Sequence, residues 1–277
     1  MDPKIGCIVT GEAAFKELQI LAKSLEPWHP KASLYILTDD ATPIESLKWK
    51  GQLHIRRTLS SYQAKRRSDM DALPGKVYRS MWTDYMYEKL NAIEWMLESP
   101  DGQGAWFLDS DITFLAPLPE IPATATLALS PHSIPEEHTK KYGLYNAGFL
   151  WLKDNKYIGA WRQAGHSSRY YEQAALEDIA RMAKQAGELY EFPVQVNYGW
   201  WRMYLSPNPK QMQEKFSLFR KDNSVGIRFE GKSLQSVHTH WFQSQHAMQT
   251  MFNEWFRRFL KPYETHAPIK KFVLGLK

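Results

Sequence analysis

The sequence contains only one cysteine, Cys7, so no disulfide can form within its 277 residues. This excludes the small secreted proteins whose stability depends on disulfides. No stretch approaches the roughly 18 uninterrupted apolar residues that a membrane-spanning helix needs. The first residues, Met1-Asp2-Pro3-Lys4, lead into a short strand-like run without the longer apolar region of a secretory signal. We therefore expect a soluble, cytoplasmic protein.

Internal repeats, low-complexity tracts and a clear linker are also missing from the sequence. A chain of 277 residues suits one large α/β domain. We expect residues 1–277 to form that domain, with its core over about 1–242 and an aromatic and basic extension over about 243–277. The basic residues are dispersed and match no recognised nucleic-acid-binding motif, so we expect no nucleic-acid partner.

Aromatic residues and positive charge are plentiful, with 11 Trp, 14 Tyr and a formal net charge of +5. The charge favours an acidic partner such as a nucleotide, an anionic glycan or a phospholipid surface, but a basic surface that only keeps the protein in solution explains it equally well. The basic and aromatic residues from Phe252 onward fit either a terminal helix packed on the core or peripheral contact with an anionic membrane. The oligomeric state is not indicated.

Short apolar strands alternate with amphipathic helices, which predicts an α/β fold with a mostly parallel sheet flanked by helices and a C-terminal helical or irregular elaboration. We expect strands at 5–10, 34–37, around 53–55, 106–108, 126–129 and 145–152, and helices at about 14–25, 76–99, 155–164 and 172–186. A polar loop is expected at 131–141, an aromatic loop at 198–201 and a hairpin over 225–239. The apolar stripe of the 76–99 helix is predicted to comprise Trp82, Met86, Leu90, Ile93 and Leu97.

The strongest local pattern is an apolar strand that runs directly into Asp109-Ser110-Asp111. Two carboxylates at the end of a buried strand need a cation or hydrogen-bond donors, because an uncompensated buried charge is costly. In open α/β sheets, ligands gather outside the carboxyl ends of the strands. The pattern therefore predicts a site for Mg²⁺ or Mn²⁺, which prefer oxygen ligands. A turn in which the Asp side chains bond to nearby backbone amides is the structural alternative.

Three further patterns fit such a site. Asn146-Ala147-Gly148 lies in a predicted strand, where Gly permits a ligand to approach closely and Asn can bond to hydroxyls. Glu172-Gln173 presents an acid and an amide at a predicted helix start. His238 and His240 alternate along a predicted strand and so share one face. One histidine with two carboxylates would complete a site for Mn²⁺ that leaves positions open for diphosphate oxygens.

The order of these motifs resembles the GT-A glycosyltransferases, and glycosyltransferase family 8 and its relatives in particular. The resemblance covers roughly residues 4–242. It implies that Asp111 is a direct metal ligand and that Asp109, with Ser110 beside it, contacts the metal or the nucleotide ribose. It also implies a late histidine as a third ligand, for which both His238 and His240 remain candidates. The implied cofactors are Mn²⁺ or Mg²⁺ and a nucleoside-diphosphate sugar, with a UDP-sugar favoured over a GDP-sugar.

The resemblance assigns the donor-side residues as well. Thr10 would grip the nucleotide and Asp39 its base or ribose, whereas Asn146 and Gly148 would border the donor sugar. Gln173 would lie near the anomeric carbon, with Glu172 beside it. This sequence has Glu-Gln where the family commonly has Asp-Gln. It also lacks the Gly-x-x-Lys-Pro-Trp that often follows the histidine and supplies a lysine for the diphosphate.

Charge on the leaving diphosphate must be neutralised in any such reaction, which calls for cationic side chains besides the metal. Arg79 and Lys89 are candidates, because the predicted helix that carries them leads into the Asp-Ser-Asp strand. A solvated helix face is an equally good explanation of both residues.

We therefore expect a metal-dependent glycosyltransferase that moves a sugar to a hydroxyl of a glycan, a lipid-linked acceptor or a small molecule. The resemblance favours retention of configuration, whereas an inverting reaction would need a carboxylate base, for which Glu172 and Glu177 are the candidates. One alternative is a zinc or dinuclear hydrolase built on the same Asp and His residues. Another is a non-catalytic glycan-binding module that uses Trp200 and Trp201.

Overall fold

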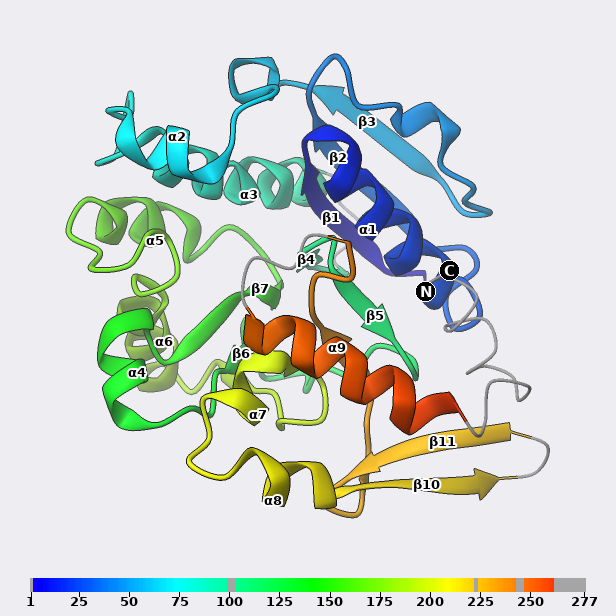
Figure 1. Ribbon diagram of the computed structural model, residues 1–277. Coiled ribbons are helices and arrows are strands. Elements are labelled where there is room, and N and C mark those ends of the chain that lie inside the picture. The colour runs from blue at the N-terminus through cyan, green and yellow to red at the C-terminus, as the bar shows by residue number, and fades with distance from the viewer. Residues whose placement is uncertain (1, 99–102, 222–223, 243–246, 262–277) are drawn as a thin grey trace.

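The computed structural model describes residues 2–98, 103–221, 224–242 and 247–261. A seven-stranded sheet in the order β3-β2-β1-β4-β7-β6-β8 forms its centre (Figure 1). The strands are β1 (Lys4–Val9), β2 (Ser33–Thr38), β3 (Leu53–Arg57), β4 (Ala105–Leu108), β6 (Leu127–Pro131), β7 (Tyr145–Leu152) and β8 (Leu189–Glu191). The neighbouring strands from β3 to β4 are parallel, and β7 runs antiparallel to both β4 and β6. The mostly parallel α/β sheet predicted from the sequence is confirmed.

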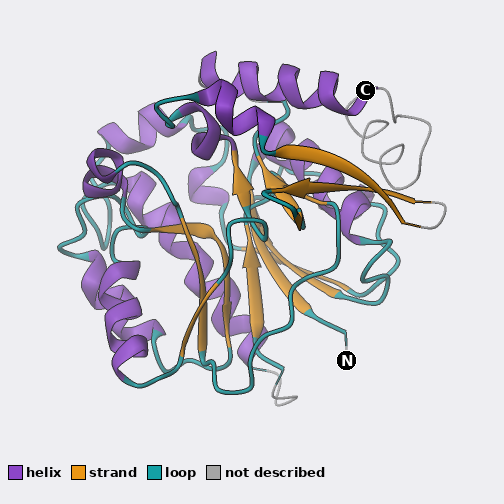
Figure 2. Cartoon of the chain, turned by 90° about the horizontal axis from the view of Figure 1, so that it is seen from below, coloured by secondary structure: helices purple, strands orange, loops and turns teal. Residues whose placement is uncertain are grey.

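Helices surround the sheet on both faces (Figure 2). They are α1 (Gly11–Leu25), α2 (Arg67–Ala72), α3 (Met81–Leu97), α4 (Glu136–Tyr142), α5 (Ile158–Gly165), α6 (Leu176–Gln185), α7 (Trp200–Tyr204), α8 (Pro209–Glu214) and α9 (Ala247–Leu260), with short 3-10 turns η1 (Ile44–Ser46) and η2 (Ser60–Tyr62). Successive side chains of a strand point to opposite faces of the sheet, so the core is divided into two clusters. Ile8 and Phe107 pack in a cluster with α3, α5 and α6, whereas Cys7 and Trp106 pack in a second cluster with α1.

Two small sheets extend the central one. The first contains β5 (Ile112–Phe114), β13 (Ser236–His238) and β9 (Tyr198–Gly199), and the second contains β10 (Phe216–Lys221), β11 (Ser224–Phe229) and β12 (Lys232–Ser233). A third apolar cluster joins these sheets to α9 through the buried side chains of Phe252, Phe256 and Leu260. The apolar face of α9 is therefore packed on the core, whereas residues 262–277 of the predicted extension lie outside the described residues. None of the helices in the described ranges combines the length and apolarity needed to cross a bilayer.

Several predicted elements are wrong in type. The predicted polar loop at 131–141 contains α4, a helix without buried residues, so no apolar periodicity marks it. The predicted aromatic loop at 198–201 consists of β9 and the start of α7. The predicted hairpin over 225–239 holds only for the short β11–β12 pairing, because the chain then crosses to β13, which pairs with β5 and β9.

Three predicted helices begin later than expected, and the one predicted from residue 155 begins at Ile158, the first residue of α5. The helix predicted from residue 76 starts at Met81, because the Ser80 side chain accepts a hydrogen bond from the backbone N–H of Thr83 and caps it. The preceding turn is held by Asp84, whose carboxylate accepts backbone hydrogen bonds from residues 76–78. The helix predicted from Glu172 starts at Leu176, so the Glu172-Gln173 pair lies in the turn before α6.

Candidate active site

The candidate residues gather at one edge of the central sheet. Thr10, Asp39 and Asp109 directly follow β1, β2 and β4, which are parallel, so all three lie at the carboxyl ends of neighbouring strands. The strand order changes direction between β1 and β4, and this switch point is where open α/β sheets bind ligands. The Asp109-Ser110-Asp111 turn also joins two sheets, because β4 belongs to the large sheet and β5 to a small one.

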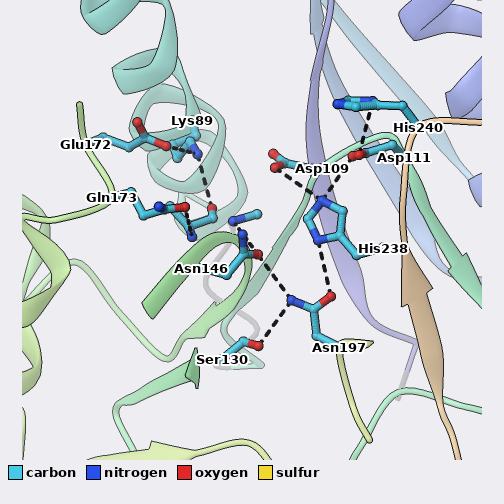
Figure 3. A network of polar contacts seen from close by, with 12 residues as sticks. Lys89, Asp109, Asp111, Ser130, Asn146, Glu172, Gln173, Asn197, His238 and His240 are labelled. Atoms are coloured by element: carbon cyan, nitrogen blue, oxygen red, sulfur yellow. Dashed lines mark hydrogen bonds and ion pairs between the residues drawn. The ribbon is translucent and has the colours of Figure 1, made fainter. Parts of the chain in front are cut away.

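Asp109, Asp111 and His238 form a compact cluster, with one potential ligand atom from each lying within 4.8 Å of the others. The His238 Nε2 atom lies 3.2 Å from Asp111 Oδ1 and 3.8 Å from Asp109 Oδ2. The pairing of His238 with Ile112 across β13 and β5 explains this approach, because Ile112 directly follows Asp111. His240 lies beyond the end of β13 and places its Nδ1 atom 3.2 Å from the other oxygen, Asp111 Oδ2 (Figure 3).

Burial and the neighbouring charges have opposite effects on the pKa values of Asp111 and His238 in this cluster. Burial alone would raise the pKa of the Asp111 carboxyl, but the neighbouring His238 and His240 and a hydrogen bond from His238 hold its pKa well below the ordinary range. Burial alone would lower the pKa of His238. The negative charges of Asp111 and, to a smaller extent, Asp109 outweigh burial, so the pKa of His238 is raised. The cluster therefore favours the ionised form of the Asp111 carboxyl next to a positive charge. A divalent cation can supply the same compensation.

The donor set fits Mn²⁺ or Mg²⁺. Asp111 is only 6% exposed, so its carboxylate is poorly solvated and needs a cation. Asp109 is more open, with a side chain 32% exposed, so its carboxylate can be reached from solvent. Two carboxylates and one imidazole leave coordination positions for other oxygen ligands. Asp109, Asp111 and His238 would hold the ion, with His240 beside them.

The predicted Asn146-Ala147-Gly148 segment of β7 lies against this cluster. The Gly148 carbonyl accepts a hydrogen bond of 2.8 Å from the backbone N–H of Asp109. A Cβ atom on Gly148 would lie 2.0 Å from Asp109 Oδ2 and 2.8 Å from His238 Cε1. Glycine is therefore required here by the space that two candidate metal ligands occupy.

We expect Gly148→Ala to weaken Mn²⁺ binding by about 10- to 100-fold, the range seen when the support of a metal ligand is removed. The added methyl group must displace the Asp109 carboxylate, which is free to rotate toward solvent, so the fold should survive. Mn²⁺ titration followed by electron paramagnetic resonance measures the effect. Gly159→Ala is the matched control, because a Cβ atom there meets nothing within 4 Å. Unchanged affinity in Gly148→Ala would contradict this arrangement.

A second polar cluster lies on the other side of β7. The Lys89 Nζ atom donates hydrogen bonds to Glu172 Oε1 at 2.5 Å and to the Ala147 carbonyl at 3.1 Å. Gln173 bonds to the same strand, accepting from the Ala147 N–H at 3.4 Å, while its Nε2 donates to the Tyr142 carbonyl at 2.8 Å. Figure 3 shows this group of residues and the metal-ligand cluster on either side of Asn146. Lys89, predicted as a diphosphate ligand, is buried in an ion pair with Glu172, a predicted catalytic residue.

The remaining predicted residues lie in different settings. The Thr10 hydroxyl forms a hydrogen bond of 3.1 Å with the Tyr85 hydroxyl. Asp39 is fully buried, and its carboxylate accepts hydrogen bonds from the N–H groups of Gly11 and residues 41–42 and from the hydroxyl of residue 42. Arg79 is exposed and precedes α3, so its predicted place on the helix is wrong. Ser110 is half-buried in the turn between the two acids.

Sequence reasoning missed two buried polar residues. Asn197 is fully buried, and its Oδ1 atom lies 3.2 Å from the Nδ1 atom of His238. Arg202, in α7, donates hydrogen bonds to the backbone carbonyls of Pro131, His132 and Val194, and burial lowers its pKa to about 9. Neither residue belongs to a recognisable motif, because an Asn in a turn and an Arg in a short helix are both common on protein surfaces.

Comparison with known proteins rests on the fold, since no protein-family model and no curated sequence matches the chain. Mouse xyloside xylosyltransferase 1 superposes with a TM-score of 0.53 and 12% identity over 86% of this chain and 97% of its own. The galactosyltransferase LgtC, in complex with donor and acceptor sugar analogues, superposes with a TM-score of 0.52 and 13% identity. The match covers 99% of this chain and 95% of LgtC. The glycosyltransferase GlyE of Streptococcus pneumoniae superposes with a TM-score of 0.51 and 15% identity, over 94% of this chain and 64% of GlyE. The resemblance that the motifs indicated is thus confirmed for the fold: this chain has the GT-A fold of these glycosyltransferases.

Proposed function

We propose that the protein is a metal-dependent glycosyltransferase that moves a sugar from a nucleoside-diphosphate sugar to a hydroxyl acceptor. The observation that carries the proposal is the Asp109, Asp111 and His238 cluster at the carboxyl edge of a GT-A sheet. A likeness in fold alone would not support a function, but here the residues suited to the chemistry lie at the edge where such sheets bind ligands. We propose a UDP-sugar as the donor, with a GDP-sugar as the alternative.

In this reaction the bond between the anomeric carbon and the diphosphate oxygen breaks, a bond from that carbon to the acceptor oxygen forms, and the proton of the acceptor hydroxyl passes to the leaving diphosphate. A bound Mn²⁺ or Mg²⁺ would act as a Lewis acid toward the diphosphate leaving group. Asp109 and Asp111 would orient the donor through the ion, and Asn146 and Gly148 would border the sugar across β7. Gln173 would face the anomeric carbon from the opposite side, held by its bonds to Tyr142 and Ala147. The acceptor is a glycan, a lipid-linked sugar or a small molecule.

We propose retention of configuration, because both carboxylates considered as an inverting base are already engaged. Glu172 forms the buried ion pair with Lys89. Glu177 pairs with Arg169 at 2.7 Å and accepts a hydrogen bond from the backbone N–H of Leu144. The hydrogen bond from Arg169 lowers the pKa of Glu177 and makes it a weaker base. Neither residue is therefore poised to remove a proton from an acceptor hydroxyl.

The two histidines should contribute unequally to metal binding. His238 is buried and approaches both carboxylates, whereas the His240 side chain is 40% exposed and approaches only Asp111. We expect His238→Ala to weaken Mn²⁺ binding at least about 10-fold more than His240→Ala, because an enclosed ligand is better oriented. Isothermal titration with Mn²⁺ measures both variants. Equal and negligible losses would remove histidine from the site.

The experiment that tests the function is thermal unfolding with UDP, GDP, CMP and dTDP, each with and without Mn²⁺. A ligand that binds only the folded protein stabilises it by about 2.7 kcal/mol at 100 times its Kd. We expect a rise in the midpoint that needs both a nucleotide and the metal, followed by release of that nucleotide from its sugar conjugates. A large shift with Zn²⁺ alone would instead indicate the hydrolase, and no shift with any ligand would favour the glycan-binding module.

A further inference from the structure

Asn197 connects the metal-ligand cluster to the donor side of β7 through a single side chain. Its Oδ1 atom lies 3.2 Å from His238 Nδ1, and its Nδ2 atom lies 3.1 Å from both Asn146 Oδ1 and Ser130 Oγ (Figure 3). All of these atoms belong to buried residues, so water is a poor substitute for any lost partner. Each polar atom of the Asn197 amide therefore has a partner within the protein.

The orientation of this amide follows from a backbone group that cannot flip. The N–H of Gly148 must donate, and it lies 3.1 Å from a side-chain atom of Asn146, which is therefore the acceptor oxygen Oδ1. The Asn197 atom facing that oxygen must then be the donor nitrogen, because two oxygens would repel one another. The other end of the Asn197 amide, facing His238, is consequently the oxygen. Ser130 does not decide the orientation, because a hydroxyl both donates and accepts.

We propose that Asn197 is a positioning residue that fixes the tautomer of His238 for metal binding. Its oxygen can only accept, so His238 Nδ1 carries a proton, and Nε2, which lies toward Asp109 and Asp111, is the nitrogen whose lone pair would bind the cation. Metal-binding histidines commonly donate their second N–H in this way, which orients the ring and raises the basicity of the ligand atom. The inference rests on the proposed function, because it assigns Asn197 to the metal site described there.

The segment that carries Asn197 is held firmly enough to act as a support. The carbonyl of Val194 accepts a hydrogen bond of 2.5 Å from the buried guanidinium of Arg202. The carbonyls of Gln195 and Val196 accept hydrogen bonds from residues 235 and 236, which precede His238 in the same strand segment. The turn that presents Asn197 and the strand that presents His238 are thus bonded to one another next to the site. Positioning groups are effective when their own surroundings are fixed.

Two isosteric variants and one control separate positioning from general stability. Asn197→Leu removes the acceptor and should weaken Mn²⁺ binding by about 10- to 100-fold. Asn197→Asp loses the same donor groups and places an oxygen opposite Asn146, but it keeps an acceptor for His238, so it should bind Mn²⁺ at least about 10-fold more tightly than Asn197→Leu. Ser130→Ala removes another partner of the same amide and should also stay within about threefold, because Ser130 does not set the orientation. Mn²⁺ binding is followed by electron paramagnetic resonance. Equal losses in both Asn197 variants would overturn the proposal.

The tautomer itself is read by nitrogen-15 resonances of labelled histidine in the wild-type protein loaded with Zn²⁺ as a diamagnetic probe. We expect a protonated Nδ1 and a metal-bound Nε2 for His238, identified by comparison with His238→Ala. An unprotonated Nδ1 would overturn the proposal even if Asn197→Leu does not fold. A wild-type protein that binds neither Mn²⁺ nor Zn²⁺ would refute both the inference and the metal-dependent function. Normal binding with the wrong tautomer would refute the inference alone.

Discussion

Asp111→Asn should reduce sugar transfer by about 1000-fold or more and abolish the metal-dependent part of nucleotide binding. Asparagine keeps the shape of the side chain but removes the negative charge that lies between His238 and His240. A factor of 1000 corresponds to about 4 kcal/mol, comparable to the several kcal/mol that a bound metal contributes to stabilising developing charge. Nucleotide-dependent thermal shifts with Mn²⁺, and release of nucleotide from its sugar conjugate, measure the two effects.

The fold should survive this change, since the amide still accepts hydrogen bonds and occupies the same volume. Circular dichroism of the metal-free variant is therefore expected to match the wild type. Asp178→Asn is the matched control, because its half-exposed carboxylate pairs with Arg181 on the surface of α6 and should matter little. Full activity in Asp111→Asn would remove the acidic turn from the mechanism. Unfolding of the variant would instead show that the carboxylate is mainly structural.

Sequence reasoning located the acidic turn because local signals agree there. A short apolar run predicts β4, and the acids follow it without an intervening polar residue. The sequence likewise predicts the whole of β7, because an eight-residue run that is apolar except for Asn146 has few other interpretations. The approach of His238 to Asp111 depends instead on the pairing of β13 with β5, more than 100 residues apart. Only the order of motifs in a known family indicated that contact.

Helix α3 shows why periodicity alone misplaced some residues. Of the predicted stripe, Leu90 and Ile93 are buried, but Trp82, Met86 and Leu97 are only half-buried. Lys89 lies outside that stripe and is nevertheless among the most buried side chains, because its charge is compensated by Glu172 from the turn before α6. Periodicity assumes that charged residues face water, and it therefore fails where an ion pair lies inside the protein.

Asn197 escaped prediction for a different reason. Its residue type and its position in a turn before β9 are typical of surface loops, and no spacing relates it to Asn146 or His238. Its partners come from three separate segments that meet only after the sheets have formed. Polar networks assembled from distant segments leave no trace in local patterns, so the structure is needed to find them.

The buried pair of Lys89 and Glu172 leads to the second large effect, which is on stability. Their side chains are 1% and 5% exposed, and the N–O distance is 2.5 Å. We expect Lys89→Met to destabilise the fold by about 3–5 kcal/mol, because it leaves the Glu172 carboxylate buried without a cation. The Glu172→Gln variant should likewise leave the Lys89 ammonium without its partner. Urea denaturation of each variant measures the loss in free energy of unfolding.

The double variant Lys89→Met with Glu172→Gln distinguishes a structural role of the ion pair from a role in nucleotide binding. Removing both charges at once avoids an unpaired buried ion, so we expect it to recover most of the stability lost by Lys89→Met alone. The sequence placed Lys89 at the diphosphate and Glu172 near the reacting carbon, whereas the structure pairs them 2.5 Å apart. If the pair only supports β7 through Ala147, the stable double variant should keep metal-dependent nucleotide binding. If the double variant has native stability but does not bind the nucleotide, Lys89 would instead be a ligand of the donor diphosphate. A Lys89→Met variant that loses less than about 1 kcal/mol would contradict the buried pair itself.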